Sequence, residues 1–305
     1  MTSGTALPPA HLLVALDGSA LAETVLALVR SLATPLGARV TLLHVLEHGA
    51  PATVHGQPHL TTAAAAEAYL RPLATRLGEG GLAVATHVHP NPEHDVAASI
   101  AAHAAELDAD LIVLATHGHG GMREWLVGRI PEQVAARAGR PVLIVPAPAE
   151  REVAAVRRLM LPVDQAGEAR AALPLARRLA IACQAQLVLV TVVPTPATLA
   201  GDAGAAALFL PQTTTSLLNW AEEQARAALD ELAEELARTG LACTTDVRRG
   251  DPARAIVQAI GAHGVDLVVL ATHARVGLGG LWAGSVTPRV GAAASCPLLL
   301  VPIPR

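Results

Sequence analysis

The sequence contains no lysine and very few aromatic residues. Phe, Trp and Tyr make up 2% of the 305 residues. Any core must therefore be built from Val, Leu, Ile and Ala, a composition that suits buried parallel strands flanked by Ala-rich helices. The lack of lysine excludes a P-loop of the form G-x4-G-K-[ST]. The net charge of −4 gives no support to a nucleic-acid partner.

Cysteine and long apolar runs are also scarce. The three cysteines all lie in the second half, without a CxxC pair, so a zinc ribbon or a dithiol redox motif is unsupported. Buried thiols in a reducing cytoplasm are the better interpretation. No apolar run approaches the roughly 18 residues needed to cross a bilayer, and the first residues lack the features of a signal peptide. We therefore expect a soluble cytoplasmic protein with no membrane partner.

The most informative feature present is an internal repeat. Residues 110–128 and 266–284 resemble each other, and each segment is followed by an apolar stretch that begins with proline, at Pro141 and Pro297. The offsets 266−110, 284−128 and 297−141 all equal 156. A constant offset across a strand, a loop and a second strand indicates a duplicated domain. We predict domains at 1–148 and 159–305, joined by a linker at 149–158.

Each half alternates apolar strand patterns with amphipathic helix patterns. In the first half the predicted strands cover 12–16, 40–46, 82–89, 111–115 and 142–145, and the helices cover 20–36, 61–77, 95–107 and 128–138. In the second half the strands cover 159–163, 187–193, 242–248, 267–271 and 298–301, and the helices cover 168–182, 217–239, 252–263 and 285–294. This alternation predicts an α/β protein of two doubly wound, five-stranded parallel-sheet domains. The second half is nine residues longer between its second and fourth strands, mostly in a loop at 194–212.

The loop after the fourth strand is the first candidate for chemistry. Small residues at the strand end, followed by a glycine where the next helix opens, let backbone N–H groups approach an anion such as phosphate. Asp17 and Asp164 end the first strand of each half, at the same edge of the sheet. A carboxylate there accepts hydrogen bonds from a ribose hydroxyl or holds Mg²⁺ through water. Two simpler interpretations remain open: glycines mark any strand–loop–helix turn, and an aspartate here can cap the following helix.

These pieces together resemble a tandem universal stress protein. The matching segments are VALDGS at 14–19, LPVD at 161–164, LIVLATHGHGG at 111–121, LVVLATHARVG at 267–277, and the final strands PVLIVP and PLLLVP. The resemblance covers nearly the whole chain. It implies two Rossmann-like domains of the adenine nucleotide alpha hydrolase type, related by a pseudo-two-fold axis and paired antiparallel through their last strands. It also implies ATP as ligand, with or without Mg²⁺, and it leaves homodimerisation open.

The family's nucleotide-binding pattern is G-x2-G-x9-G-[S/T]. The first half carries Ala115, Gly118, Gly128 and Arg129 at these positions, and the second half carries Ala271, Ala274, Gly284 and Ser285. By the same resemblance, Asp17 and Asp164 lie near the ribose and the backbones of Val45 and Val192 meet the adenine. The helix openings, which include Ile130 and Val286, meet the phosphates. We favour the first half as the better site, because a Cβ at position 274 costs roughly 1 kcal/mol or more where the backbone needs a positive φ.

The resulting hypothesis is a stress-response regulator that binds ATP and has no catalytic residues, with slow hydrolysis at most. The alternative is a nucleotide-free member of the same fold that acts through protein contacts. An adenylating enzyme is less favoured, because the S-G-G-x-D-S loop of that class is not found after either first strand. Eleven of the thirteen histidines lie in the first half, with His87 and His89 on one strand face. No second ligand group has diagnostic spacing, so we predict no metal site.

Overall fold

Ten strands form one continuous sheet in the computed structural model, which describes residues 10–117, 129–147, 155–164, 167–199, 201–272 and 286–303. The first half contributes β1 (His11–Ala15), β2 (Arg39–Glu47), β5 (Val84–Glu93), β6 (Leu111–His117) and β7 (Val142–Ala147). The second half contributes β8 (Arg158–Pro162), β9 (Gln186–Val193), β10 (Cys243–Arg249), β11 (Leu267–Thr272) and β12 (Leu298–Pro302). The strand order is β10-β9-β8-β11-β12-β7-β6-β1-β2-β5.

Within each half every strand pairing is parallel. The α/β architecture predicted from the repeat is therefore confirmed. Strand β1 lies between β2 and β6, and β8 lies between β9 and β11, so each half reverses its direction of winding beside its first strand. Such a switch point leaves a crevice at the carboxyl ends of the strands, where ligands of α/β proteins bind.

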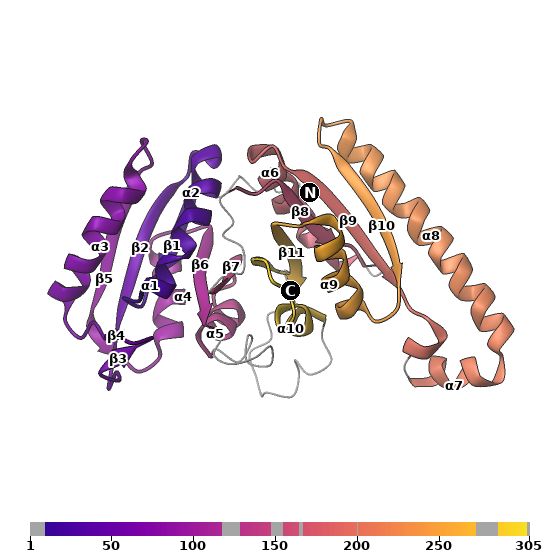
Figure 1. Cartoon of the computed structure of the whole chain (residues 1–305), viewed down its shortest axis with the longest axis horizontal. Coiled ribbons are helices and arrows are strands. Elements are labelled where there is room, and N and C mark those ends of the chain that lie inside the picture. Colours follow the sequence, from indigo (N-terminus) through magenta and orange to yellow (C-terminus); the bar gives the residue numbers. More distant parts are fainter. Residues whose placement is uncertain are drawn as a thin grey trace.

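The two halves meet where β12 runs antiparallel to β7. Leu299 lies opposite Leu143, Leu298 opposite Ile144 and Leu300 opposite Val142. Since 299−143 equals the repeat offset of 156, Leu143 faces its own equivalent, and the two flanking pairs are exchanged when the halves are interchanged. This register places a local two-fold axis between Leu143 and Leu299, which are 0% and 1% exposed. The two five-stranded sheets therefore join through β7 and β12 into a single sheet with a two-fold axis at its centre (Figure 1).

Helices cover both faces of the sheet. One layer contains α1 (Ala20–Glu23), α2 (Val25–Leu36), α3 (Ala63–Gly78), α6 (Leu173–Ala182) and α8 (Pro211–Ala237). The other layer contains α4 (Val96–Glu106), α5 (Arg129–Arg137), α9 (Pro252–His263) and α10 (Val286–Gly291). Alternate side chains of a strand reach alternate layers: Leu12 and Val14 pack into the first core and Leu13 into the second, all fully buried. None of the helices in the described ranges combines the length and apolar character that crossing a bilayer requires.

Several boundaries differ from the sequence predictions for local reasons. The helix predicted over 20–36 divides into α1 and α2 at Thr24, whose hydroxyl donates a 2.7 Å hydrogen bond to the Leu21 carbonyl. Between β2 and α3, where the sequence predicted neither strand nor helix, the chain forms a hairpin of β3 (Thr53–Val54) and β4 (Gln57–Pro58). The helix predicted over 168–182 begins as a 3-10 turn, η1 (Glu168–Ala171).

The loop predicted at 194–212 is largely helical. It contains a 3-10 turn, η2 (Pro196–Thr198), the helix α7 (Gly201–Phe209) and the start of α8, which begins at Pro211 rather than at 217. A proline at the first position of a helix costs no backbone hydrogen bond and presets its φ angle. The extra residues of the second half therefore extend helical structure beyond the sheet, at the lower right of Figure 1.

Candidate functional site

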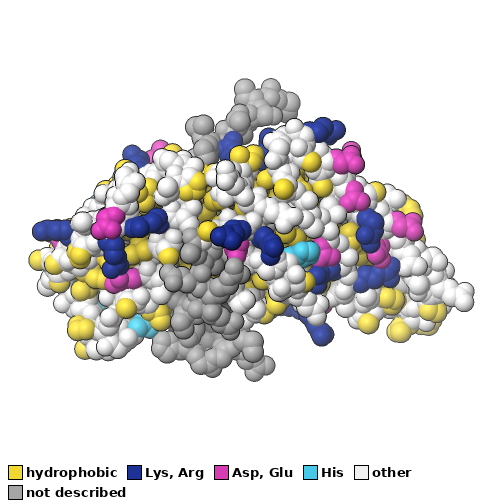
Figure 2. Space-filling view, turned by 45° about the horizontal axis from the view of Figure 1, so that its top comes forward, with side chains coloured by type: hydrophobic (Ala, Val, Ile, Leu, Met, Phe, Trp, Pro, Cys, Tyr) yellow, Lys and Arg dark blue, Asp and Glu magenta, His cyan; other side chains and the backbone are white. Residues whose placement is uncertain are grey.

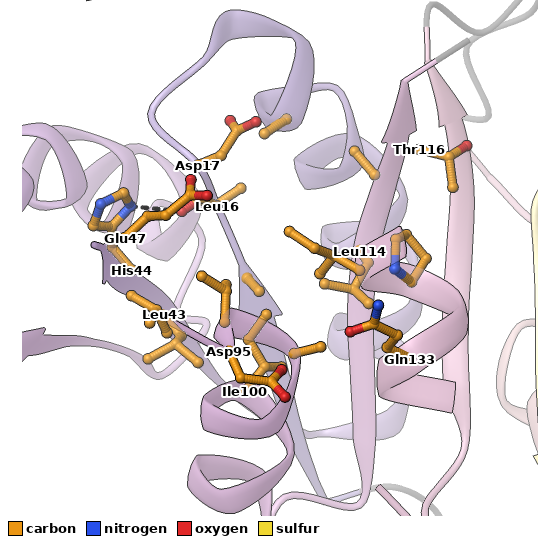
Figure 3. Close-up of a pocket in the computed structure, with 18 of the residues that line it drawn as sticks. Leu16, Asp17, Leu43, His44, Glu47, Asp95, Ile100, Leu114, Thr116 and Gln133 are labelled. Atoms are coloured by element: carbon orange, nitrogen blue, oxygen red, sulfur yellow. Dashed lines mark hydrogen bonds between the residues drawn. The ribbon is translucent and has the colours of Figure 1, made fainter. Parts of the chain in front are cut away.

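A cavity of about 670 Å³ opens at the switch point of the first half. Its walls come from the carboxyl ends of β1, β2 and β6, from the first half of α4 and from residues along α5. Figure 3 shows side chains from these elements around a common space. Pockets for small ligands and cofactors have volumes of about 300–1,000 Å³ and lie at such switch points. We call this space the half-one cavity.

Asp17 lies at one end of the half-one cavity, directly after β1. Its Oδ1 accepts hydrogen bonds from the backbone N–H of Ser19 at 2.9 Å and from the Ser19 hydroxyl at 2.6 Å. The Ser19 oxygen in turn accepts from the N–H of Ala22 and caps α1. Ser19 is thus the helix cap, and Asp17 orients it. The carboxylate is held at the mouth of the cavity by this turn.

Gly18 makes the turn between β1 and α1 possible. Its φ is +91°, and a Cβ at this position would stand 2.7 Å from Cδ1 of Leu60. An L side chain is strained at such a φ, and the contact would require Leu60 to move. The Asp-Gly-Ser segment at 17–19 therefore depends on glycine to bring its carboxylate to the edge of the sheet.

The wall formed by β2 contains polar groups in an apolar strand. His44 is 1% exposed, and its Nδ1 donates a 2.7 Å hydrogen bond to the Leu16 carbonyl (Figure 3). Burial lowers the pKa of His44 below 6.5, so the ring is neutral at pH 7. Glu47 ends β2, with the Nε2 of His59 at 3.9 Å from its Oε2. Val45 also lines the cavity and is buried.

The opposite wall is formed by the beginning of α4 and by residues along α5, from Ile130 to its last residue, Arg137. Asp95 caps α4 by accepting from the N–H of Ala98 at 3.0 Å, and both of its oxygens accept from Nη1 of Arg137, at 2.7 and 2.6 Å. These two partners, the Ala98 N–H first, lower the pKa of Asp95. Gln133 lies one turn before Arg137 and points toward Asp95 across the cavity (Figure 3). An ion pair and a neutral amide therefore flank the opening.

The second half contains the same ion pair with a different arginine. Asp251 caps α9 and is paired with Arg289 of α10 through two hydrogen bonds of 2.8 and 2.6 Å. Asp251 is equivalent to Asp95 by the 156-residue offset, but Arg289 is equivalent to Gln133. In the first half the arginine stands one helical turn later, at Arg137. Both halves therefore contain an Asp–Arg ion pair, but the arginine stands at a different position in the first half. There the position equivalent to Arg289 holds the neutral Gln133, which lines the cavity.

The structure brings several predicted residues of the first half together. Asp17, Val45, Ala115 and Ile130 all line the half-one cavity. Arg129 is the first residue of α5, and its side chain lies outside the described part of the structure. Gly118 and Gly128 lie outside the described residues.

The predicted residues of the second half occupy the equivalent edge. Asp164 follows β8, is exposed, and accepts a 2.9 Å hydrogen bond from the N–H of Ala169 in η1. Val192 lies in β9, Ala271 in β11, and Val286 opens α10. Ala274, Gly284 and Ser285 lie outside the described residues.

Most of the lining residues were not predicted as part of the site. The polar and charged ones among them are His44, Glu47, His59, His94, Asp95, Thr116, Gln133 and Arg137. Asp95 was predicted only as the start of the helix over 95–107. The repeat contained a signal for it, since Asp95 and Asp251 share the 156-residue offset and each precedes a helix. No comparable signal marks Arg137, because its counterpart in the second half is not an arginine.

The histidines near β5 form a chain of contacts. His103 Nε2 lies 3.0 Å from His89 Nδ1, and His89 Nε2 lies 2.8 Å from Glu93 Oε1. His87 packs against the His103 ring at 4.7 Å between centroids. Within the described ranges, no three His, Cys, Asp or Glu side chains gather so as to hold a metal ion. The contacts tie β5, the outermost strand of this half, to α4.

Comparison with known proteins identifies one family. The model of the universal stress protein family matches the chain twice, over residues 10–146 and 155–302. A universal stress protein from Archaeoglobus fulgidus DSM 4304 is 14% identical, with a TM-score of 0.71 and 98% of each chain covered. A functionally unknown protein from Pseudomonas aeruginosa PAO1 is 18% identical, with a TM-score of 0.70 over 98% of this chain and 94% of that one.

The same architecture occurs in another setting. The cytoplasmic domain of a prokaryotic cation chloride cotransporter is 14% identical, with a TM-score of 0.53 over 96% of this chain and 95% of that one. No curated protein matches the sequence significantly. At these identities the structural likenesses establish the fold alone, and function must be argued from the site.

Proposed function

Since the chain belongs to the universal stress protein family, we propose that it binds an adenine nucleotide, ATP, in the half-one cavity. The observation that carries this proposal is the cavity itself: about 670 Å³ at a switch point, with a carboxylate at one wall and the opening of a helix at another. We further propose that the protein is a cytoplasmic stress-response regulator that hydrolyses ATP slowly at most and has no catalytic residue.

The described residues suit the parts of a nucleotide. The Asp17 carboxylate would accept a hydrogen bond from a ribose hydroxyl, and the backbone at Val45 would meet the adenine. The opening of α5, at Arg129 and Ile130, would offer N–H groups and the positive end of the helix dipole to phosphates. Any Mg²⁺ would arrive bound to the phosphates.

Two lining groups have opposite effects on an anionic ligand. The carboxylate of Asp95 would repel phosphates, and its ion pair with Arg137 offsets that charge. Gln133 adds a neutral amide that donates and accepts hydrogen bonds. The wall near α5 thus avoids a net negative charge without a lysine.

The pairing of β7 with β12 supports a further part of the proposal. Through this contact the two halves of one chain are related as the subunits of a two-fold dimer would be. The proposed role of the two-fold contact is to hold the half-one cavity and the equivalent edge of the second half in one rigid sheet.

The experiment uses matched substitutions at the ends of β6 and β11. Ala115 lines the half-one cavity, and Ala271 is its equivalent in the second half by the 156-residue offset. Ala115→Leu fills part of the cavity and should weaken ATP binding by roughly tenfold or more, since overpacking costs about 1–3 kcal/mol. Ala271→Leu should leave binding close to wild type. Calorimetry and the Tm shift with ATP and Mg²⁺ measure both.

The outcomes separate the possibilities. Equal losses in both variants would contradict the assignment to the first half. The absence of heat and of any Tm shift for the wild type at millimolar ATP would reject the proposal. A nucleotide-free protein that acts through contacts is the second candidate, and it is favoured by one observation, the cluster of exposed apolar side chains on α7 and α8.

A further inference from the structure

A cluster of large apolar side chains is exposed where α7 joins α8. Its members are Leu208 (81% exposed), Phe209 (83%), Leu210 (58%), Leu217 (60%) and Trp220 (60%). We call these five residues the apolar corner. It contains the single Phe of the chain and one of its three Trp residues. In a protein with 2% aromatic residues, placing these two in solvent is costly unless another surface covers them.

The apolar corner is separate from the protein's own core. Leu217 and Trp220 stand three positions apart in α8, a spacing that places side chains on one face of a helix. Leu210 is the residue just before that helix, at its N-cap. The residues of α8 that pack inward here are Leu218 and Ala225, on a face roughly 120° away at 100° per residue. The exposed face is therefore not needed to hold α8 on the sheet.

The corner protrudes from one half of the molecule. Helix α7 and the start of α8 extend past the ends of β9 and β10 at one end of the molecule (Figure 1), and apolar side chains are visible at that end in the space-filling view (Figure 2). It is built from the residues that make the second half longer. The first half has the β3–β4 hairpin after β2 instead. Each chain therefore carries one apolar corner.

The charges around the corner restrict what can cover it. Between residues 201 and 221 the only charged residue is Asp202. Glu222, next along α8, is paired with Arg226 and Arg249. A surface without unpaired basic residues has little attraction for an anionic membrane or for nucleic acid. Two copies of a surface without net charge do not repel each other. The apolar corner of one chain can therefore pack against the apolar corner of a second copy.

The exposed area is large enough for a specific contact. At about 150–250 Å² for a large apolar or aromatic residue, the exposed fractions of the five residues amount to roughly 500–850 Å². A standard interface buries about 800 Å² on each partner. The corner alone therefore approaches the area that one side of a stable dimer requires.

We propose that the apolar corner is the contact between two copies of this chain. A contact of a surface with its own copy is isologous and closes with two-fold symmetry. Because each chain has one corner, assembly stops at a dimer and does not continue into a fibre. The contact lies away from the half-one cavity and does not depend on nucleotide binding.

The test measures mass in solution for the full chain. Sedimentation velocity and light scattering, from about 1 to about 100 µM, should give a dimer of twice 31.2 kDa for the wild type. Phe209→Asp should give the 31.2 kDa monomer. Ile181→Asp is the matched control, since Ile181 is 48% exposed on α6, and it should remain a dimer.

Three results would overturn the proposal. The first is a wild type that is monomeric over the whole concentration range, and the second is a Phe209→Asp variant that stays dimeric with an unchanged circular dichroism spectrum. The third is a monomeric wild type that sediments with neutral phosphatidylcholine vesicles while Phe209→Asp does not, which would assign the corner to lipid. Trp220→Glu gives a second variant if Phe209→Asp fails to fold.

Discussion

The ion pair between Asp95 and Arg137 allows the electrostatics of the half-one cavity to be tested. Both side chains are partly exposed, at 48% and 33%, so the pair itself should contribute about 0.2–1 kcal/mol to the free energy of unfolding. Arg137→Ala should therefore change stability little. It should change nucleotide affinity more, because it leaves the Asp95 carboxylate facing the phosphates without its cation.

The size of this effect follows from Coulomb's law. At a separation on the order of 6 Å, one unit charge costs about 0.7 kcal/mol at an effective dielectric constant of about 80 and about 1.4 kcal/mol at about 40. Arg137→Ala should thus weaken ATP binding roughly three- to tenfold. Asp95→Asn should strengthen it by a similar factor, because Arg137 is then unpaired. The double variant should return close to wild type.

The assay is calorimetry of ATP binding at low and high salt. Salt screens partly exposed charges, so the differences among the variants should shrink as the ionic strength rises. Arg289→Ala, which breaks the equivalent pair in the second half, is the control and should not affect the half-one cavity. If Asp95→Asn weakens binding as much as Arg137→Ala does, the pair acts by shaping the cavity and the electrostatic reasoning is refuted.

Three further outcomes are expected. Gly18→Ala should lower the free energy of unfolding by about 1–3 kcal/mol, from its positive φ and the contact with Leu60; in urea titrations Gly37→Ala, which has a positive φ but no nearby atom, should cost less. Burial lowers the pKa of His44 in the folded state, and also those of His11 and His87. The free energy of unfolding should therefore be highest above pH 6.5 and should fall as the pH drops below that value, by up to about 1.4 kcal/mol per pH unit for each of these groups; urea midpoints that are unchanged between pH 7.5 and 5.5 would contradict this. Burial raises the pKa of the Cys296 thiol to about 12, so iodoacetamide should alkylate it only after unfolding, as mass spectrometry would show.

Most of the fold could be predicted because its signals are local or periodic. The buried strands are short runs of Val, Leu and Ile bounded by turn residues, and Asp95 and Ser19 stand where helices begin. The predictions were less accurate where two local preferences compete. Thr24 divides a helix because its hydroxyl bonds to the backbone, and much of the segment at 194–212, predicted as a loop, is helical.

The candidate site was predicted only in part. Asp17, Val45, Ala115 and Ile130 follow from strand ends and from the family pattern. Arg137 could not be predicted in this way, because its partner, Asp95, lies 42 positions earlier in the chain. Which arginine reaches a given carboxylate depends on the direction in which two packed helices run, and a spacing within one helix does not contain that information.

The sequence by itself determined the duplication, the order of strands and helices, and the edge of the sheet at which a ligand would bind. These follow from the 156-residue offset and from the periods of two and 3.6 residues that burial imposes. Only the tertiary structure decided the register that sets Leu143 opposite Leu299, the choice of Arg137 as the partner of Asp95, and the common exposure of Phe209 and Trp220. Each of these depends on distances between segments far apart in the chain, which arise only when the helices and strands have packed.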